Sequence, residues 1–183
     1  MSSLNRAAAL AFLAVAACAG VPQSSAVRSP SLGVPMTDAE LAPWDISIPP
    51  SGAGLPPGSG TARSGAAVYD QKCAACHGAK GVGKPADPLA GGQGSLASKA
   101  PLRTVGSYWP YATTLFDYVR RAMPITNPLS LTNDEVYAVS AYVLYLNGIV
   151  GEDAQMNAQT LPQVKMPNRD GFIDDWQSRA ENR

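Results

Sequence analysis

Charged side chains are scarce in this 183-residue chain, and histidine is almost absent. Only 15% of the residues are charged, the 14 basic and 14 acidic side chains cancel, and there is one histidine. This neutral balance offers no argument for nucleic acid or an acidic polymer as a partner. The length allows one domain with accessory segments, and the 45% of hydrophobic residues suits a compact domain with polar flanks.

Long hydrophobic runs are also lacking. The run Ala7–Ala17 has eleven residues, whereas a membrane-spanning helix needs about 20. Arg6 precedes this run and small residues follow it, which is typical of an export signal over residues 1–19. No other stretch is long and uncharged enough to span a membrane.

The end of the export signal contains a cysteine in a suggestive context. Val15-Ala16-Ala17-Cys18 resembles a bacterial lipobox, in which Cys18 becomes the lipidated first residue of the mature protein. Ordinary cleavage after Ala19, or later after Ala26, is the alternative. Either route predicts a protein in the periplasm, either soluble or attached to a membrane by a lipid anchor.

Proline and glycine divide the rest of the chain into three parts. Residues 20–62 are rich in Pro, Gly, Ser and Ala, and such a segment buries too little apolar surface to offset its ordering entropy. We therefore expect a flexible tether there, a folded domain over residues 63–150, and an extended C-terminal tail over residues 151–183. The tail is polar and interrupted by prolines, so we expect it to pack on the domain or on a partner.

Three segments of the predicted domain have helical spacing. Gly65, Tyr69 and Cys73 share one face of a helix expected over residues 64–72. A second helix is expected over 111–122 and a third over 132–147, where Thr132 and Glu135 are spaced as a capping box. Nothing alternates with period two over a useful length, which favours an all-α fold without a substantial sheet.

The chemistry is indicated by one pentapeptide, Cys73-Ala74-Ala75-Cys76-His77. Two thiols separated by two residues can form thioethers with the two vinyl groups of a haem, and the next residue then presents an imidazole to the iron. A thioredoxin-like dithiol usually starts a helix, whereas this pair ends one. A structural zinc site needs four ligands, and Cys18 is the only other cysteine. The pattern therefore predicts one covalently attached haem c.

The second axial ligand of the iron has to come from another residue type, since His77 is the only histidine. With no second histidine, the candidates are methionine, lysine, water or a terminal amine. Met123 lies between the second and third expected helices and precedes Pro124, which stiffens the backbone. Met166 also precedes a proline and is the reserve candidate. For either residue, filling the core is the alternative role.

A helix, CxxCH, a glycine-rich loop, Met-Pro and a final helix together resemble the class I cytochromes c over about residues 63–148. The resemblance implies an all-α fold of three to five helices around one haem. It also implies that the first and last helices cross, with Gly65 and Tyr69 against Tyr142 and Val143. In that family a proline carbonyl accepts a hydrogen bond from the axial histidine. The resemblance assigns this role to Pro88, with Pro85 as the alternative.

A narrower resemblance covers about residues 101–172. The stretch Thr104–Pro124 and the tail Leu161–Phe172 are similar to cytochrome subunits of sulfur-oxidising systems. Those subunits accept electrons from molybdenum-containing sulfite or sulfane dehydrogenases and pass them to a further cytochrome or an oxidase. The resemblance implies such partners here, on a separate polypeptide. Within this stretch Arg103, Tyr108 and Trp109 are candidates for lining the haem pocket, with Trp109 as core filler the alternative.

Three functions compete at this point. The first is a mono-haem electron carrier serving a sulfite or sulfane dehydrogenase, or another periplasmic dehydrogenase. The second is a haem enzyme with a displaceable sixth ligand, which the single CxxCH and the lack of a distal histidine disfavour. The third is an anchored adaptor with a structural haem. We expect the electron carrier.

Overall fold

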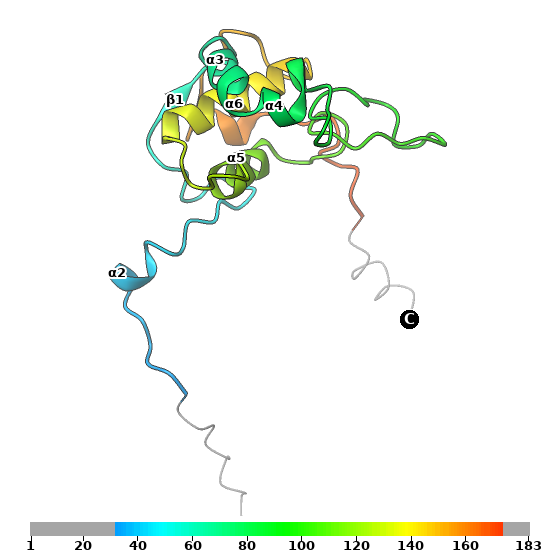
Figure 1. Cartoon of the computed structure of the whole chain (residues 1–183). Helices are drawn as coiled ribbons and strands as arrows, with labels where there is room; N and C mark the ends of the chain where they lie inside the picture. The colour runs from blue at the N-terminus through cyan, green and yellow to red at the C-terminus, as the bar shows by residue number, and fades with distance from the viewer. Residues whose placement is uncertain (1–31, 174–183) are drawn as a thin grey trace, which may run out of the picture. The chain divides into compact units, whose positions relative to one another are not determined.

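The computed structural model describes residues 32–173 (Figure 1). The predicted export signal, Cys18 and residues 20–31 lie outside the described residues. The chain divides into two units, residues 1–42 and 43–183. In the described part of the first unit, the only regular element is the single-turn helix α2 (Asp38–Leu41). All the other elements described below belong to the second unit.

The second unit is helical, as the sequence predicts. Its elements follow in this order: β1 (Ser59–Gly60), α3 (Ala62–Lys72), α4 (Ala74–His77), the 3-10 turn η1 (Ala79–Gly81), α5 (Ala112–Ala122), α6 (Asn133–Leu146), β2 (Met156–Asn157) and the 3-10 turn η2 (Leu161–Gln163). The two strands form one short antiparallel pair. Between residues 32 and 173, no helix combines the length and apolarity required to cross a bilayer.

The predicted capping box starts the longest helix. The Thr132 hydroxyl accepts from the backbone N–H of Glu135, and the Glu135 carboxylate accepts from the backbone N–H of Thr132. These reciprocal bonds satisfy two of the N–H groups that a helix start leaves unpaired. At the other end Asn147 is the C-cap, and Gly148 takes a positive φ of 68° that a residue with a side chain would adopt only with strain.

Helices α3 and α6 cross at very short range. A Cβ placed on Gly65 would overlap the backbone carbonyl of Ala138, so only glycine lets the two backbones approach this closely. One turn further along, the rings of Tyr69 and Tyr142 lie 5.2 Å apart at a tilt of 53°. The expected crossing through Gly65, Tyr69 and Tyr142 is therefore confirmed.

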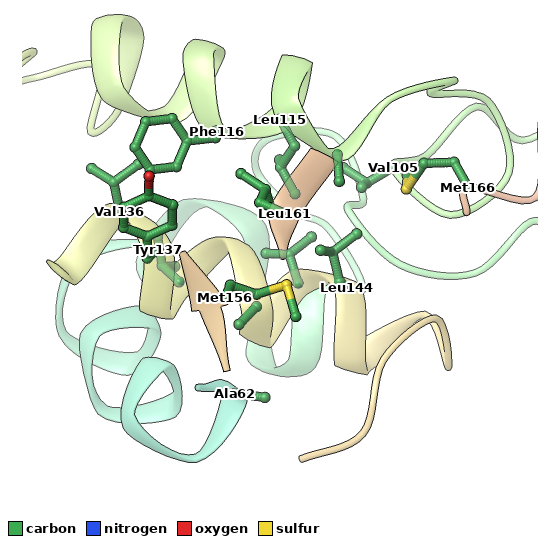
Figure 2. Packing of buried hydrophobic residues seen from close by; sticks show 14 of the residues in the cluster. Ala62, Val105, Leu115, Phe116, Val136, Tyr137, Leu144, Met156, Leu161 and Met166 are labelled. Atoms are coloured by element: carbon green, nitrogen blue, oxygen red, sulfur yellow. The ribbon is translucent and has the colours of Figure 1, made fainter. Parts of the chain in front are cut away.

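The core lies where α5 packs on α6. Phe116 and Tyr137 have no exposed surface, and their ring centroids are 4.5 Å apart. Leu144 and Leu161 extend the same cluster (Figure 2). Leu161 comes from η2, so the C-terminal tail contributes directly to the core.

The tail continues over the loop that precedes α5. Met166 is buried at 3% exposure, the Asn168 side-chain amide donates to the Tyr108 carbonyl at 2.7 Å, and the Arg169 guanidinium lies 4.3 Å from the centre of the Tyr111 ring. From β2 to residue 172 the tail therefore packs on the domain.

The prediction of a flexible tether is wrong for residues 46–60, which wrap around α5 and α6. Ile48 is buried at 5% exposure, and its N–H donates to the Asp117 carboxylate at 2.9 Å. The Tyr137 hydroxyl donates to the Pro56 carbonyl at 2.9 Å. Side chains of the helices thus pair with backbone groups of this proline-rich segment, in which only the last two residues, Ser59 and Gly60, belong to a strand.

The ion pair between Lys72 and Glu135 joins α3 to the start of α6. The Lys72 Nζ lies 2.6 Å from the Glu135 carboxylate, and about a quarter of that carboxyl side chain is exposed. Donation from Lys72, and then from the Thr132 N–H, lowers the pKa of Glu135 below its ordinary 4.5. A lowered pKa in the folded state means that the pair stabilises the fold above pH 4.5. That contribution is lost as the pH falls through the folded-state pKa.

Glu135→Gln tests this linkage, because glutamine keeps the capping box but not the charge. We expect the free energy of unfolding to fall by about 0.5–1 kcal/mol at neutral pH and to match the wild type in strong acid, as measured by urea denaturation across the pH range. Lys72→Met should show the same loss, and the double variant no further loss. A difference that persists in acid would contradict the ion-pair explanation.

Gly65→Ala tests the helix crossing. The added methyl group has no space, so we expect the free energy of unfolding to fall by at least about 1–3 kcal/mol, the usual cost of overpacking. Gly151→Ala is the matched control because nothing lies within 4 Å of the position that its Cβ would take, and we expect a change within about 0.5 kcal/mol there. Equal effects in denaturant titrations of the two variants would show that the crossing is not tight.

Candidate haem-attachment site

The pentapeptide that predicts haem attachment forms the junction between α3 and α4. Cys73 is at once the C-cap of α3 and the N-cap of α4, with φ −127° and ψ −39°. The following single turn is closed by the His77 N–H, which donates to the Cys73 carbonyl at 2.9 Å. The helix therefore ends at the CxxCH motif, as the sequence predicts, and a tight turn sets the spacing between the two cysteines.

The two cysteines are not joined in a disulfide. Cys73 is half-buried and Cys76 is exposed. Burial raises the pKa of the Cys73 thiol to about 11, so this thiol is protonated at neutral pH. Redox dithiols instead depend on a cysteine whose pKa is lowered. The environment therefore disfavours the thioredoxin-like alternative and leaves both sulfurs free for thioether bonds.

His77 is held by one hydrogen bond that determines which ring nitrogen is available. Its Nδ1 lies 2.8 Å from the Asp87 carbonyl oxygen. Because a carbonyl oxygen can only accept, Nδ1 carries the proton and Nε2 keeps its lone pair. A fixed tautomer of this kind is what a metal-ligating histidine needs.

The acceptor of this bond differs from the prediction. We expected the carbonyl of Pro88, or of Pro85, whereas the structure uses the carbonyl of Asp87. That oxygen belongs to the peptide bond joining Asp87 to Pro88, one residue before the predicted position. A proline restricts the residue that precedes it to extended conformations, so Pro88 acts on the bond through the orientation of the Asp87 peptide.

Backbone hydrogen bonds tie the following loop to the CxxCH motif. The Gly83 N–H donates to the His77 carbonyl at 2.7 Å, and the Ala86 N–H donates to the Cys76 carbonyl at 2.9 Å. The Tyr69 hydroxyl donates to the Gly78 carbonyl at 2.9 Å, which connects α3 to the same turn. These bonds hold the Asp87 carbonyl in place beside the imidazole.

Asn147 anchors the glycine-rich loop to the end of α6. Its side-chain amide donates to the Leu89 carbonyl at 3.0 Å, and its oxygen accepts from the Gly91 N–H at 3.0 Å. In the sequence, Asn147 is simply the last residue of the helix expected over residues 132–147, and this second role was not predicted. A buried asparagine after a helix, opposite a glycine-rich loop, is the signal that could have indicated it.

The candidate sixth ligand lies at the end of α5. Met123 is the C-cap of that helix, in an extended conformation with φ −119° and ψ 145°, and it is half-buried. Met166 is instead 3% exposed and Met156 5% exposed. Both belong to the hydrophobic core (Figure 2). Among the methionines of the second unit, Met123 is therefore the one that the core does not enclose.

The three predicted pocket residues do not converge on one place. The Arg103 guanidinium lies 5.4 Å from the centre of the Tyr108 ring, and both residues line a pocket of about 370 Å³ together with Phe172. Neither His77 nor the two cysteines line that pocket. Trp109 is half-buried against the core. Its ring lies nearly perpendicular to the Tyr118 ring, at 83°, with the centroids 5.7 Å apart.

The donor set fits haem c better than a bare metal ion. Across residues 32–173, no three His, Cys, Asp or Glu side chains come together in a group that could hold a metal. Two free thiols beside an imidazole with an available Nε2 instead match the requirements of covalent haem. Cys73 and Cys76 would form the thioethers, and His77 would ligate the iron.

Comparisons with known proteins agree with this assignment. A family model described as cytochrome c oxidase, cbb3-type, subunit III matches residues 60–143. The solved structure of the sulfane dehydrogenase SoxCD from Paracoccus pantotrophus is similar to the chain at 40% sequence identity, covering 84% of this chain and 76% of that chain with a TM-score of 0.76. No curated protein matches. The chain therefore belongs to the c-type cytochromes, with the class I fold and covalently bound haem c.

Membership of this family makes the chain an electron carrier. When bound, haem c supplies an iron that accepts and releases one electron at a time. The residues of the chain fix the position of that group and its ligands. Asp87 orients the imidazole of His77, and the core behind Cys73 keeps water from one side of the attachment site.

Gly78→Ala tests whether the turn after His77 supports the site. A Cβ on Gly78 would lie 2.5 Å from the Gly83 carbonyl oxygen, and the φ of +72° adds strain. Gly94→Ala is the matched control, with a φ of +76° and open space around the Cβ. We expect Gly94→Ala to lose about 1–2 kcal/mol of stability from the left-handed conformation, and Gly78→Ala to lose more, because its methyl group also overlaps the Gly83 carbonyl.

Only Gly78→Ala should also lower the yield of haem-loaded protein, because it displaces the loop that carries Asp87. The measurement is the thermal midpoint together with the ratio of haem absorbance to protein. Indistinguishable ratios for the two variants would contradict a supporting role for this turn.

Proposed function

We propose that the chain is a mono-haem cytochrome that accepts single electrons from a molybdenum-containing sulfite or sulfane dehydrogenase subunit in the periplasm. The observation that carries this proposal is the similarity to SoxCD at 40% identity over 84% of the chain. The similarity to SoxCD covers 84% of the chain, whereas the general family model matches only residues 60–143. It therefore includes segments outside the part common to many cytochromes.

The location follows from the chemistry and the N-terminus together. Residues 1–19 have the pattern of an export signal, and Cys18 stands where a lipidated cysteine would. The protein works in the periplasm, free or lipid-anchored, and passes its electron to a further cytochrome or an oxidase.

Met123 would supply the second ligand of the haem iron. Its sulfur is a weak donor, and a methionine–histidine pair raises the reduction potential of the iron. A high potential suits a carrier that receives electrons from a dehydrogenase and passes them onward. Core packing of Met166 and Met156 supports the choice of Met123, because removing either from the core would cost buried apolar contacts.

Met123→Ala tests the ligand assignment. We expect loss of the weak long-wavelength band typical of sulfur ligation, a shift of the ferric protein toward high spin, and a lower reduction potential. Met166→Ala is the contrast. It should keep the ligand spectrum and lose about 2–5 kcal/mol of stability, the usual cost of truncating a buried methionine. Absorption spectra and potentiometric titrations of both variants distinguish the two methionines. If Met166→Ala rather than Met123→Ala loses the ligand spectrum, Met166 is the ligand.

The identity of the protein that donates electrons to the cytochrome is tested by purification of the chain from the native periplasm. We expect molybdenum to accompany haem c in a constant ratio, measured by elemental analysis across a size-exclusion peak. Co-purification of a dehydrogenase with another cofactor would replace the molybdenum enzyme with a different donor. Catalytic turnover of a small substrate by the isolated chain would instead favour a haem enzyme.

A further inference from the structure

The segment just before the wrapped domain exposes an unusual set of large apolar side chains. Between residues 32 and 44 these are Leu32, Val34, Met36, Leu41 and Trp44. Trp44 is 78% exposed, whereas Ile48, four residues later, is buried at 5%. A concentration of exposed apolar residues in a short segment marks a contact surface rather than ordinary scatter.

The segment has local order that would reduce the cost of binding. Thr37 and Glu40 form a complete capping box around α2, with the Thr37 N–H donating to the Glu40 carboxylate at 2.9 Å. Pro35 and Pro43 flank this turn and restrict the backbone on both sides. None of the residues of α2 is buried, so the turn is available to a partner. Preorganisation of this kind lowers the entropy lost on association.

The charge of the segment favours a protein over an anionic lipid surface as its partner. From residue 29 to residue 62 there is no lysine or arginine, while Asp38, Glu40 and Asp45 are acidic. Anionic lipid surfaces attract basic segments and repel acidic ones. An apolar groove with a cationic rim on a protein is the surface that complements this composition.

The similarity to SoxCD extends into the same region. Residues 46–183 make up about three quarters of the chain, so a match that covers 84% of it must include part of the segment before residue 46. The related structure therefore has an equivalent for some of this N-terminal segment, although the family model begins only at residue 60.

From these observations we infer that residues 32–44 are a docking arm that binds an apolar, cation-rimmed groove on the molybdenum subunit. The inference rests on the proposed function, because it takes that subunit as the partner. Trp44 and Met36 are the anchors, since tryptophan is enriched among the residues that carry most of the binding energy and methionine is enriched at interfaces. The carboxylates of the arm align it in the groove and speed its association with the partner, and they add less to the affinity.

The test uses the full mature holo-cytochrome and the molybdenum subunit separated from the native complex. Their dissociation constant is measured by titration for the wild type, for the double variant Met36→Ala/Trp44→Ala, and for Ile173→Ala. Ile173 is the matched control because it is apolar and 86% exposed but lies outside the arm. Flotation with phosphatidylethanolamine–phosphatidylglycerol vesicles is measured in parallel.

We expect the arm variant to bind the molybdenum subunit at least tenfold more weakly, with an unchanged haem spectrum, while Ile173→Ala binds as the wild type does. Equal affinities for the wild type and the arm variant would overturn the docking arm and leave the proposed function intact. Loss of vesicle binding with unchanged affinity for the subunit would also overturn it, in favour of a membrane contact. If no molybdenum subunit accompanies the wild type, both the proposed function and the arm fail.

Discussion

The close crossing of α3 and α6 is the constraint on which the rest of the molecule depends. Gly65 lets the α3 backbone reach the Ala138 carbonyl, and the crossing fixes where α3 ends. The CxxCH motif occupies that end, so the packing of two helices sets the position of both cysteines and of His77. Tyr69, which lies at the crossing, also donates a hydrogen bond from its hydroxyl to the Gly78 carbonyl. This bond holds the turn that follows His77 against α3.

Features with a local physical cause could be predicted from the sequence. The CxxCH motif, the three helices and the capping box of Thr132 and Glu135 all depend on residues a few positions apart, so spacing alone indicates them. The crossing at Gly65 could be inferred only through a family resemblance, because its partner Ala138 lies more than seventy residues away in the sequence. Helix boundaries agree with the predicted ranges to within two residues.

Features that depend on backbone groups of distant residues could not be predicted. Any residue has a carbonyl, so no side-chain pattern distinguishes Asp87 from Pro88 as the partner of His77. The composition of residues 46–60 also led to a wrong prediction, because a segment of low hydrophobicity is expected to bury little surface and to stay flexible. In the fold, the carboxylate of Asp117 and the hydroxyl of Tyr137 bind the backbone of that segment. A proline-rich sequence can therefore be ordered by hydrogen bonds that helices supply to it.

We propose that a single haem, which Cys73, Cys76 and His77 would hold, takes one electron at a time from a molybdenum dehydrogenase. Stopped-flow mixing of the ferric cytochrome with the substrate-reduced dehydrogenase tests it most directly. We expect each chain to take up one electron, at a rate at least equal to the turnover of the dehydrogenase. A ferric cytochrome that stays oxidised, or that is reduced only far more slowly than turnover, would contradict it.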